Sequence, residues 1–179
     1  MVFTALEPSR ESVTFHSKSG PLIVRREGDM LALDFPSRPP TRRDPPAGLV
    51  EALGATPSEV WASRDLMAVF DSELAVRGLT PSFDRIRALE LFGLIVTAPG
   101  REVDFVSRFF APSVGVPEDP VTGSAHCTLV PCWAKRLGKQ RLIARQVSVR
   151  GGELLCEDRG DRVSMAGRAV QYLSGVIEV

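Results

Sequence analysis

One nine-residue segment combines a carboxylic acid with a backbone that can bind an anion: Glu118-Asp119-Pro120-Val121-Thr122-Gly123-Ser124-Ala125-His126. It follows a strand-like run and opens a helix-like run. A helix that begins with Gly-Ser leaves backbone N–H groups unpaired at its positive end, where a carboxylate or phosphate can bind. Asp119 stands beside that end as a proton-transfer group. The segment therefore predicts chemistry on a small carboxylate.

The same residues also have a purely structural interpretation. Asp119 or Thr122 can cap the helix, and Gly123 can simply make a turn. On the local pattern alone, the two interpretations stay equally open, so the surrounding elements matter.

The strand-like and helix-like runs around this segment predict an α+β fold. Period-two alternation of apolar residues predicts strands at 13–16, 22–25, 30–35, 59–63, 66–72, 92–98 and 103–110, with strands and turns again from 142 onward. Short helices are expected at 48–53, 73–78 and 83–89. Residues 36–46 contain five prolines and four charged residues. That stretch is predicted to be a linker that joins no sheet.

The longest predicted helix covers residues 122–137. An apolar stripe at four-residue spacing is typical of a helix with one buried face, and it consists of Ala125, Leu129, Trp133 and Leu137. Gly138 should end the helix. Pro131 interrupts it and should kink it, because proline has no N–H to donate to the Cys127 carbonyl.

Composition excludes several classes of function. The chain is 44% hydrophobic and 25% charged, with a formal net charge of zero, which is typical of a soluble globular protein and favours neither nucleic acid nor membrane as a partner. No apolar run approaches the ~20 residues of a membrane span, and no signal peptide opens the chain, so a cytoplasmic location is expected. The three cysteines fit no zinc spacing and are expected to be buried and reduced, without a metal.

The chain contains an internal repeat with a constant offset of 132 residues. Ser19-Gly20-Pro21-Leu22-Ile23 matches the segment Gly151-Gly152-Glu153-Leu154-Leu155, and Gly28-Asp29 matches Gly160-Asp161. Both turns stay in register without a gap, which favours two copies of one β-unit over two unrelated hairpins. The second copy follows the helix of residues 122–137. The equivalent helix of the first copy would lie before Met1.

Four stretches carry a resemblance to a known family. They are Ser19-Gly20-Pro21-Leu22 with Leu33-Asp34-Phe35-Pro36, the run Asp104-Phe105-Val106-Ser107-Arg108-Phe109-Phe110-Ala111-Pro112, the central segment 118–126, and Ala166-Gly167-Arg168-Ala169-Val170. The chain resembles the C-terminal part of the PhzF-like family, phenazine-biosynthesis-type isomerases with the diaminopimelate-epimerase fold. The resemblance implies two lobes, each a β-sheet wrapped around a central helix, with the active site in the cleft between them. It also implies homodimers.

The resemblance implies cofactor-free proton transfer on a small carboxylic acid. Asp119 and Ser124 would be the catalytic residues, with Asp119 binding substrate or relaying a proton. The substrate-binding positions would be Thr122, Gly123, Ala125 and His126. Of these, His126 lies one turn into the helix and is expected to support packing rather than to contact substrate.

This chain departs from the family in the first lobe. Nothing between Met1 and Ser12 resembles the segment that carries the family's principal acid/base carboxylate or the Gly-His motif of the first helix. We therefore expect an incomplete first lobe (residues 1–46), a complete second lobe (47–165) and a C-terminal strand segment (166–179). The isomerase would then be inactive as this chain. The alternative is a non-catalytic module that binds a small acid or mediates oligomerisation.

Two further enzyme classes are disfavoured. A racemase of this fold would use a thiol ahead of the glycine turn, whereas Cys127 lies past it. A Ser-His-Asp hydrolase would need Ser124 and His126 to face each other, but residues two apart on a helix do not.

Overall fold

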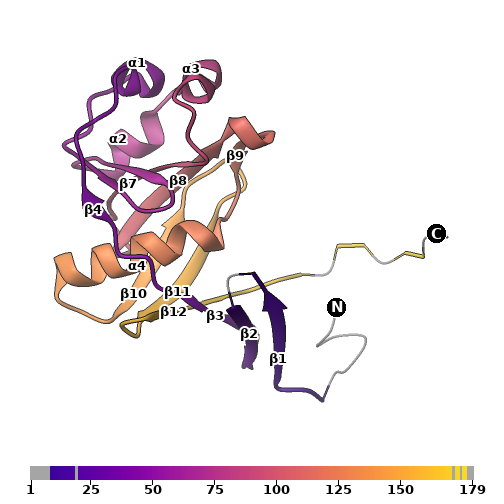
Figure 1. Ribbon diagram of the computed structural model, residues 1–179. Coiled ribbons are helices and arrows are strands. Elements are labelled where there is room, and N and C mark those ends of the chain that lie inside the picture. Colours follow the sequence, from indigo (N-terminus) through magenta and orange to yellow (C-terminus); the bar gives the residue numbers. More distant parts are fainter. Residues whose placement is uncertain (1–8, 19, 171, 174, 177–179) are drawn as a thin grey trace.

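The computed structural model describes residues 9–18, 20–170, 172, 173, 175 and 176. In that part of the chain, twelve strands form one mixed sheet in the order β1-β2-β3-β12-β11-β10-β8-β7-β6-β5-β4, with β9 paired to β8 (Figure 1). The strands are β1 (Ser12–Ser17), β2 (Gly20–Glu27), β3 (Met30–Pro36), β4 (Thr41–Arg42), β5 (Glu59–Ala62), β6 (Leu66–Val69), β7 (Leu94–Pro99), β8 (Phe105–Ala111), β9 (Val116–Asp119), β10 (Arg141–Gln146), β11 (Gly152–Asp158) and β12 (Arg162–Gly167). The helices are α1 (Leu49–Leu53), α2 (Glu73–Gly78), α3 (Phe83–Ala88) and α4 (Gly123–Leu137), with a 3₁₀ turn at Pro112–Val114.

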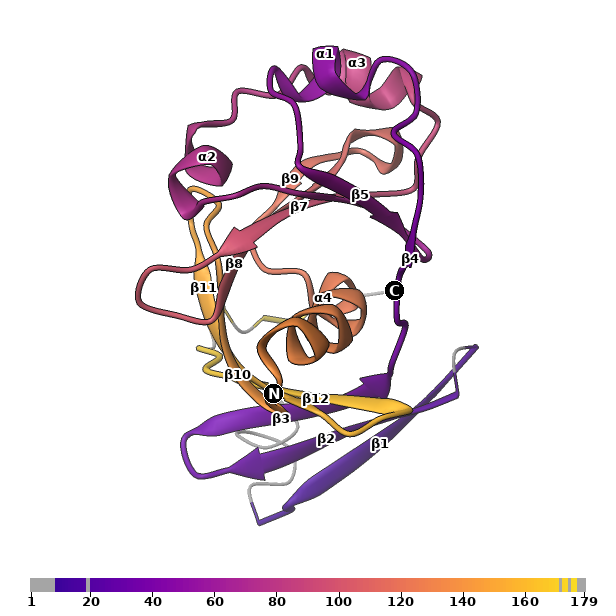
Figure 2. The same cartoon turned by 90° about the vertical axis from the view of Figure 1, so that its left-hand side faces the viewer.

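The sheet curls around α4, which Figure 2 shows nearly end-on inside the ring of strands. Ala125, Leu129 and Trp133 are at most 4% exposed, which confirms three positions of the predicted apolar stripe. The fourth, Leu137 in the last turn of the helix, is 41% exposed, so the prediction that it is buried was wrong. The Trp133 ring stacks on Phe105 of β8, with the ring centroids 5.6 Å apart and the planes 3° from parallel. The helix therefore forms the centre of the main hydrophobic core.

A second core lies on the outer face of β6, β7 and β8. It is covered by the three short helices α1, α2 and α3, as Figures 1 and 2 show, and includes Leu53, Val76, Ile86 and Phe110. The strands β6 and β7 are buried on both faces, which explains their nearly continuous apolar sequences. Within the described residues, no helix is both long and apolar enough to cross a membrane.

Two predictions about local structure were wrong. Thr41 and Arg42 of the presumed linker pair with Ala62 and Trp61 of β5, because a two-residue edge strand between prolines needs a hydrogen-bonding partner on one side only. The C-terminal strand segment ends at Gly167. Gly167 pairs with Leu31, and β3 begins at Met30, so only that one residue of β3 extends past the pairing with Gly167. Residues 168–170, 172, 173, 175 and 176 form no strand. The rest of that segment, like residues 1–8, lies outside the described residues.

The gap left by Pro131 in the hydrogen bonding of α4 is filled by the linker. Helix α4 runs on through Pro131 to Leu137 and ends at Gly138, which adopts a left-handed conformation. The Cys127 carbonyl, which Pro131 cannot serve, accepts a hydrogen bond of 2.9 Å from the backbone N–H of Arg38. One proline in the helix thus docks the segment after β3 onto α4.

The internal repeat reappears as symmetry in the sheet. The β2–β3 hairpin and the β11–β12 hairpin begin 132 residues apart, at Gly20 and Gly152. The two copies meet through β3 and β12, where Leu33 pairs with its own repeat partner Met165. The flanking pairs, Leu31 with Gly167 and Phe35 with Val163, exchange under the same offset. A local two-fold axis therefore passes through the Leu33–Met165 pair.

The two copies differ in what covers their apolar faces. In the second copy, four side chains pack in the main core around α4: Leu154, Cys156, Val163 and Met165. Their counterparts 132 residues earlier are all partly exposed: Leu22, Val24, Leu31 and Leu33. Together with Phe15, three of these line an apolar groove of about 470 Å³ that reaches Gly123 at the start of α4. Among the described residues, no helix covers this apolar face of the first copy.

Candidate functional site

The turn between β9 and α4 carries the predicted acid. Asp119 ends β9, and Thr122 is the N-cap residue of α4. The Thr122 side chain makes no capping hydrogen bond; instead its hydroxyl donates to Asp119 Oδ2 over 2.5 Å. The interpretation of Thr122 as a simple helix cap is therefore wrong. The side chain that would cap the first turn of α4 holds the Asp119 carboxylate instead.

Gln146, at the end of β10, fixes this turn from inside the protein. Its side chain is completely buried. The Oε1 atom accepts from the Thr122 N–H at 2.8 Å, and Nε2 donates to the Asp119 carbonyl at 2.6 Å and to Thr122 Oγ1 at 3.1 Å. These partners determine the orientation of the amide, because an N–H only donates and a carbonyl only accepts. Since Thr122 Oγ1 accepts from Gln146, its own hydrogen is directed to Asp119.

The loop between β10 and β11 clamps the other side of the turn. The Ser148 hydroxyl donates to the Pro120 carbonyl at 2.9 Å and accepts from the Gly151 N–H at 3.0 Å. Gly152 lies directly against Val121, where a Cβ atom would come within 2.4 Å of a valine methyl group. Only glycine fits at this approach, so the turn is packed as well as hydrogen-bonded.

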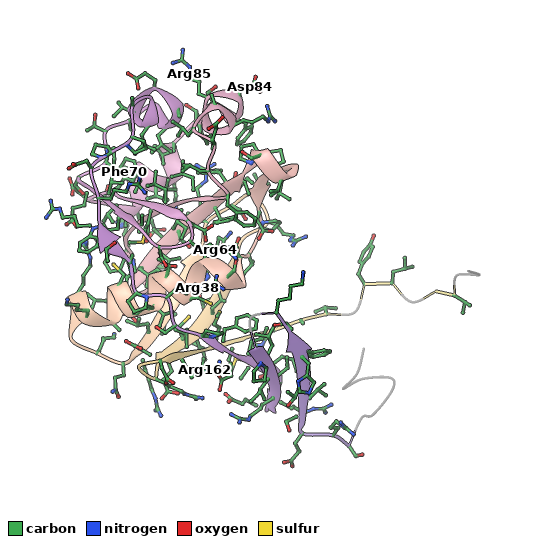
Figure 3. All side chains as sticks on the ribbon, in the orientation of Figure 1. Arg38, Arg64, Phe70, Asp84, Arg85 and Arg162 are labelled. Carbon is green, nitrogen blue, oxygen red and sulfur yellow. The ribbon has the colours of Figure 1, made fainter. Side chains whose placement is uncertain are left out.

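Arg64, from the turn between β5 and β6, reaches the first turn of α4. Its Nη2 atom donates to Ser124 Oγ and to Asp65 Oδ2, both at 3.0 Å. The guanidinium lies over the Phe92 ring, 4.6 Å from the centroid. Figure 3 shows Arg64 above the N-terminal half of α4. This arginine adds positive charge where the helix dipole is already positive.

The remaining predicted site residues divide between the surface and the core. Gly123 and Ser124 are partly exposed, whereas Ala125 and His126 are buried. His126 Nδ1 lies 2.8 Å from the Thr122 carbonyl, so this nitrogen carries the hydrogen, and the ring lies 6.0 Å from that of Phe105. Burial lowers the pKa of His126, which keeps the ring neutral. In this position His126 supports the first turn of α4 from inside.

Comparison with known proteins places this geometry in a family. The model of the phenazine biosynthesis-like proteins matches residues 2–175. This chain belongs to that PhzC-PhzF family. It is 48% identical over 174 residues to an uncharacterized isomerase of Pseudomonas aeruginosa, covering 97% of this chain and 67% of the relative.

Solved structures confirm the fold. A PhzF-family phenazine biosynthesis protein of Enterococcus faecalis superposes with a TM-score of 0.89 at 43% identity, covering 93% of this chain and 65% of that one. A hydroxyproline epimerase of Agrobacterium vitis shares the fold alone, with a TM-score of 0.54 at 10% identity. The chain thus spans about two thirds of the length of these PhzF relatives. The epimerase-like fold expected from the sequence is confirmed.

The thiols of this PhzF-family chain are placed for packing. Cys127, Cys132 and Cys156 are buried and free, as predicted. Burial raises the pKa of all three, that of Cys156 to about 12. Cys127 Sγ points to the Gly123 carbonyl at 3.8 Å. A thiolate base is disfavoured, and the described residues contain no group of three or more His, Cys, Asp or Glu side chains that could hold a metal ion.

In the described part of the chain, no hydrogen bond joins one of the three would-be hydrolase residues to another. Asp119 accepts from Thr122, His126 binds the Thr122 carbonyl, and Ser124 accepts from Arg64. A serine nucleophile needs a base within hydrogen-bond reach, and no such bond joins Ser124 to His126 here. The structure therefore gives no support to a Ser-His-Asp arrangement.

Glu118, the first residue of the motif, has a structural role. Its carboxylate forms a two-point ion pair with Arg108 at 2.7 and 3.0 Å. Arg108 also donates to the carbonyls of Val76 and Leu79 at the end of α2. The motif in this PhzF-family chain therefore contains two carboxylates with different surroundings. Glu118 is paired with Arg108, whereas Asp119 is partly exposed beside the start of α4.

We expect Gln146→Leu to lower the free energy of unfolding by about 2–4 kcal/mol, because it leaves the buried Thr122 N–H and Asp119 carbonyl without partners. Urea unfolding measures this value. Gln140→Leu, at an exposed position before β10, is the matched control and should stay within about 0.5 kcal/mol of the parent. Equal effects of the two substitutions would contradict the role given to Gln146.

Proposed function

We propose that this chain is the acid-bearing part of a cofactor-independent isomerase that moves a proton on a small carboxylic acid. The observation that carries the proposal is the fixed position of the Asp119 carboxylate at the start of α4. This carboxylate is half-buried at the open end of α4 and held by the Thr122 hydroxyl, while Gln146 fixes the turn beneath it. A fixed carboxylate beside an anion-binding helix end suits proton transfer on an acid.

The proposed reaction uses only proton movement. The acid group of the substrate is attracted to the positive end of α4, where the Thr122 side chain does not cap the first-turn N–H groups and leaves those of Gly123, Ser124 and Ala125 as donors. Asp119 takes a proton from one carbon, the electrons of that C–H bond shift the double bond, and a proton returns at another carbon. Isomerisation of this kind changes neither the composition nor the oxidation state of the substrate.

The length of the relatives bears on how active this chain is alone. We propose that residues 1–46 belong to a first lobe, 47–165 to the second and 166–179 to a C-terminal segment. A complete cleft would then need both lobes. With one wall, the chain positions substrate on one side only, so we expect weak catalysis.

Deuterium exchange tests the proposal. The chain is incubated with 2,4-hexadienoate in ²H₂O, and incorporation of deuterium at carbon is followed by NMR. In parallel, ¹⁵N spectra record the amide shifts of Gly123, Ser124 and Ala125 as the acid is added. We expect slow exchange above the uncatalysed rate, together with shifts at these amides. Absence of both would overturn the proposed function.

A non-catalytic role in oligomerisation is favoured by one observation, the uncovered apolar groove. Phe15 is 48% exposed, and Leu31 and Leu33 beside it are only partly buried. A contiguous apolar face of this kind marks an interaction surface. The alternative proposal is therefore an assembly module in which a second copy of the chain covers this face.

We expect the chain to self-associate through this groove, and Leu31→Asp to shift it toward monomer by placing a charge on the face. Light scattering over a range of concentrations measures the mass. Leu74→Asp, on the exposed side of α2, is the matched control and should leave the mass unchanged. A parent chain that stays monomeric at high concentration would contradict self-association.

A further inference from the structure

Arg38 has an unsatisfied charge next to α4. Its backbone is fixed on the Cys127 carbonyl, and its side chain is partly buried. The Nη1 atom is buried without any hydrogen-bond partner. Arginine remains charged in proteins, and a buried guanidinium nitrogen without an acceptor is costly. The neighbouring arginines are paired, Arg64 with Asp65 and Arg162 with Asp34, whereas none of the ion pairs among the described residues includes Arg38.

Arg38 and Arg64 reach the same face of α4 from separate segments. Arg64 binds Ser124, and Arg38 is anchored at Cys127. These two helix positions are three residues apart, so they are neighbours on one face. Figure 3 shows both labelled arginines over the N-terminal half of α4. Both guanidinium charges also act on the Cys127 thiol and lower its pKa, against the larger effect of burial.

The position of these arginines bears on how a substrate lies in the site. A carboxylate placed directly beside Asp119 would meet a like charge. Arg38 instead offers a positive charge without an ion-pair partner among the described residues, whereas the Asp119 carboxylate is already held by the Thr122 hydroxyl. If the substrate carboxylate lies beside Arg38, it is kept apart from the Asp119 carboxylate, and Asp119 can then face a carbon atom of the substrate.

We propose that Arg38, assisted by Arg64, binds the acidic group of the substrate beside Ser124 at the start of α4 and so directs the reacting carbon toward Asp119. This inference rests on the proposed function and names the residues that recognise the acid. Arg38 supplies the free N–H donors. Arg64, already balanced by Asp65, orients Ser124 Oγ and adds positive potential.

Two matched probes test the proposal, 2,4-hexadienoate and its neutral amide. We expect the acid to bind at least tenfold more tightly than the amide in NMR titrations. Arg38→Gln should weaken acid binding by roughly 10- to 100-fold, the range for a hydrogen bond to a charged group, and leave amide binding unchanged. Arg38→Lys keeps the charge but loses the planar fork, and should retain part of the preference. Arg85→Gln, on the exposed face of α3 in Figure 3, is the control and should bind as the parent does.

A direct readout does not depend on how the variants fold. In the parent chain, the Arg38 Nε–H signal should shift with the acid and stay in place with the amide. No shift with the acid, or an unchanged preference for the acid in folded Arg38→Gln, would overturn the arginine site. Asp119→Asn separates the two proposals. It should lose deuterium exchange while keeping the preference for the acid, so that persistent exchange removes the proposed function and leaves the arginine site standing.

Discussion

Asp119→Asn is expected to lower the rate of deuterium incorporation into 2,4-hexadienoate by about 10²- to 10⁴-fold, the usual contribution of a positioned acid or base. The asparagine side chain has nearly the same shape and can still accept the hydrogen bond that Thr122 now donates over 2.5 Å. It cannot take a proton from carbon. The expected result is therefore a folded chain that binds the acid but exchanges at the background rate. NMR in ²H₂O measures the exchange, and circular dichroism checks the fold.

The matched control for this substitution is Asp84→Asn. Asp84 lies on α3, its side chain is 92% exposed, and Figure 3 shows it at the top of the view, well above Arg64. Its replacement should leave the exchange rate unchanged. If Asp119→Asn exchanged deuterium as fast as the Asp84 variant, proton transfer would have to be assigned to another group.

Trp133→Ala is expected to lower the free energy of unfolding by about 3–5 kcal/mol. The side chain is 4% exposed, stacks on Phe105 and donates from Nε1 to Thr97 Oγ1 at 3.0 Å. Alanine would leave a cavity between α4 and the sheet that wraps it. It would also remove the only link between the helix and Thr97 that the described hydrogen bonds contain. Chemical denaturation followed by circular dichroism measures the loss.

Trp133→Phe separates packing from hydrogen bonding. Phenylalanine fills most of the space and keeps an aromatic face toward Phe105, so only the bond to Thr97 is lost, which costs about 1 kcal/mol. An alanine variant no less stable than the phenylalanine variant would show that α4 is not the centre of the core.

The sequence by itself determined the features that repeat along the chain. Four-residue spacing predicted the buried stripe of α4, because one face of a helix must be apolar to pack inside a sheet. The offset of 132 residues predicted two copies of one β-unit, and the pairing of Leu33 with Met165 confirms them. The missing N–H of Pro131 predicted that the helical hydrogen bond to the Cys127 carbonyl is lost. Such properties belong to local geometry, so they can be deduced without knowledge of the fold.

Only the tertiary structure decided what surrounds Asp119. Gln146 reaches the turn from 27 residues away, and Arg64 reaches Ser124 from 60 residues away. Neither lies in a pattern that distinguishes it from other glutamines and arginines of the chain. The two-residue strand that ties the linker to β5 was missed for the same reason. Contacts of this kind depend on which segments the sheet brings around α4, and that is set by long-range packing and strand pairing rather than by the spacing of residues along the chain.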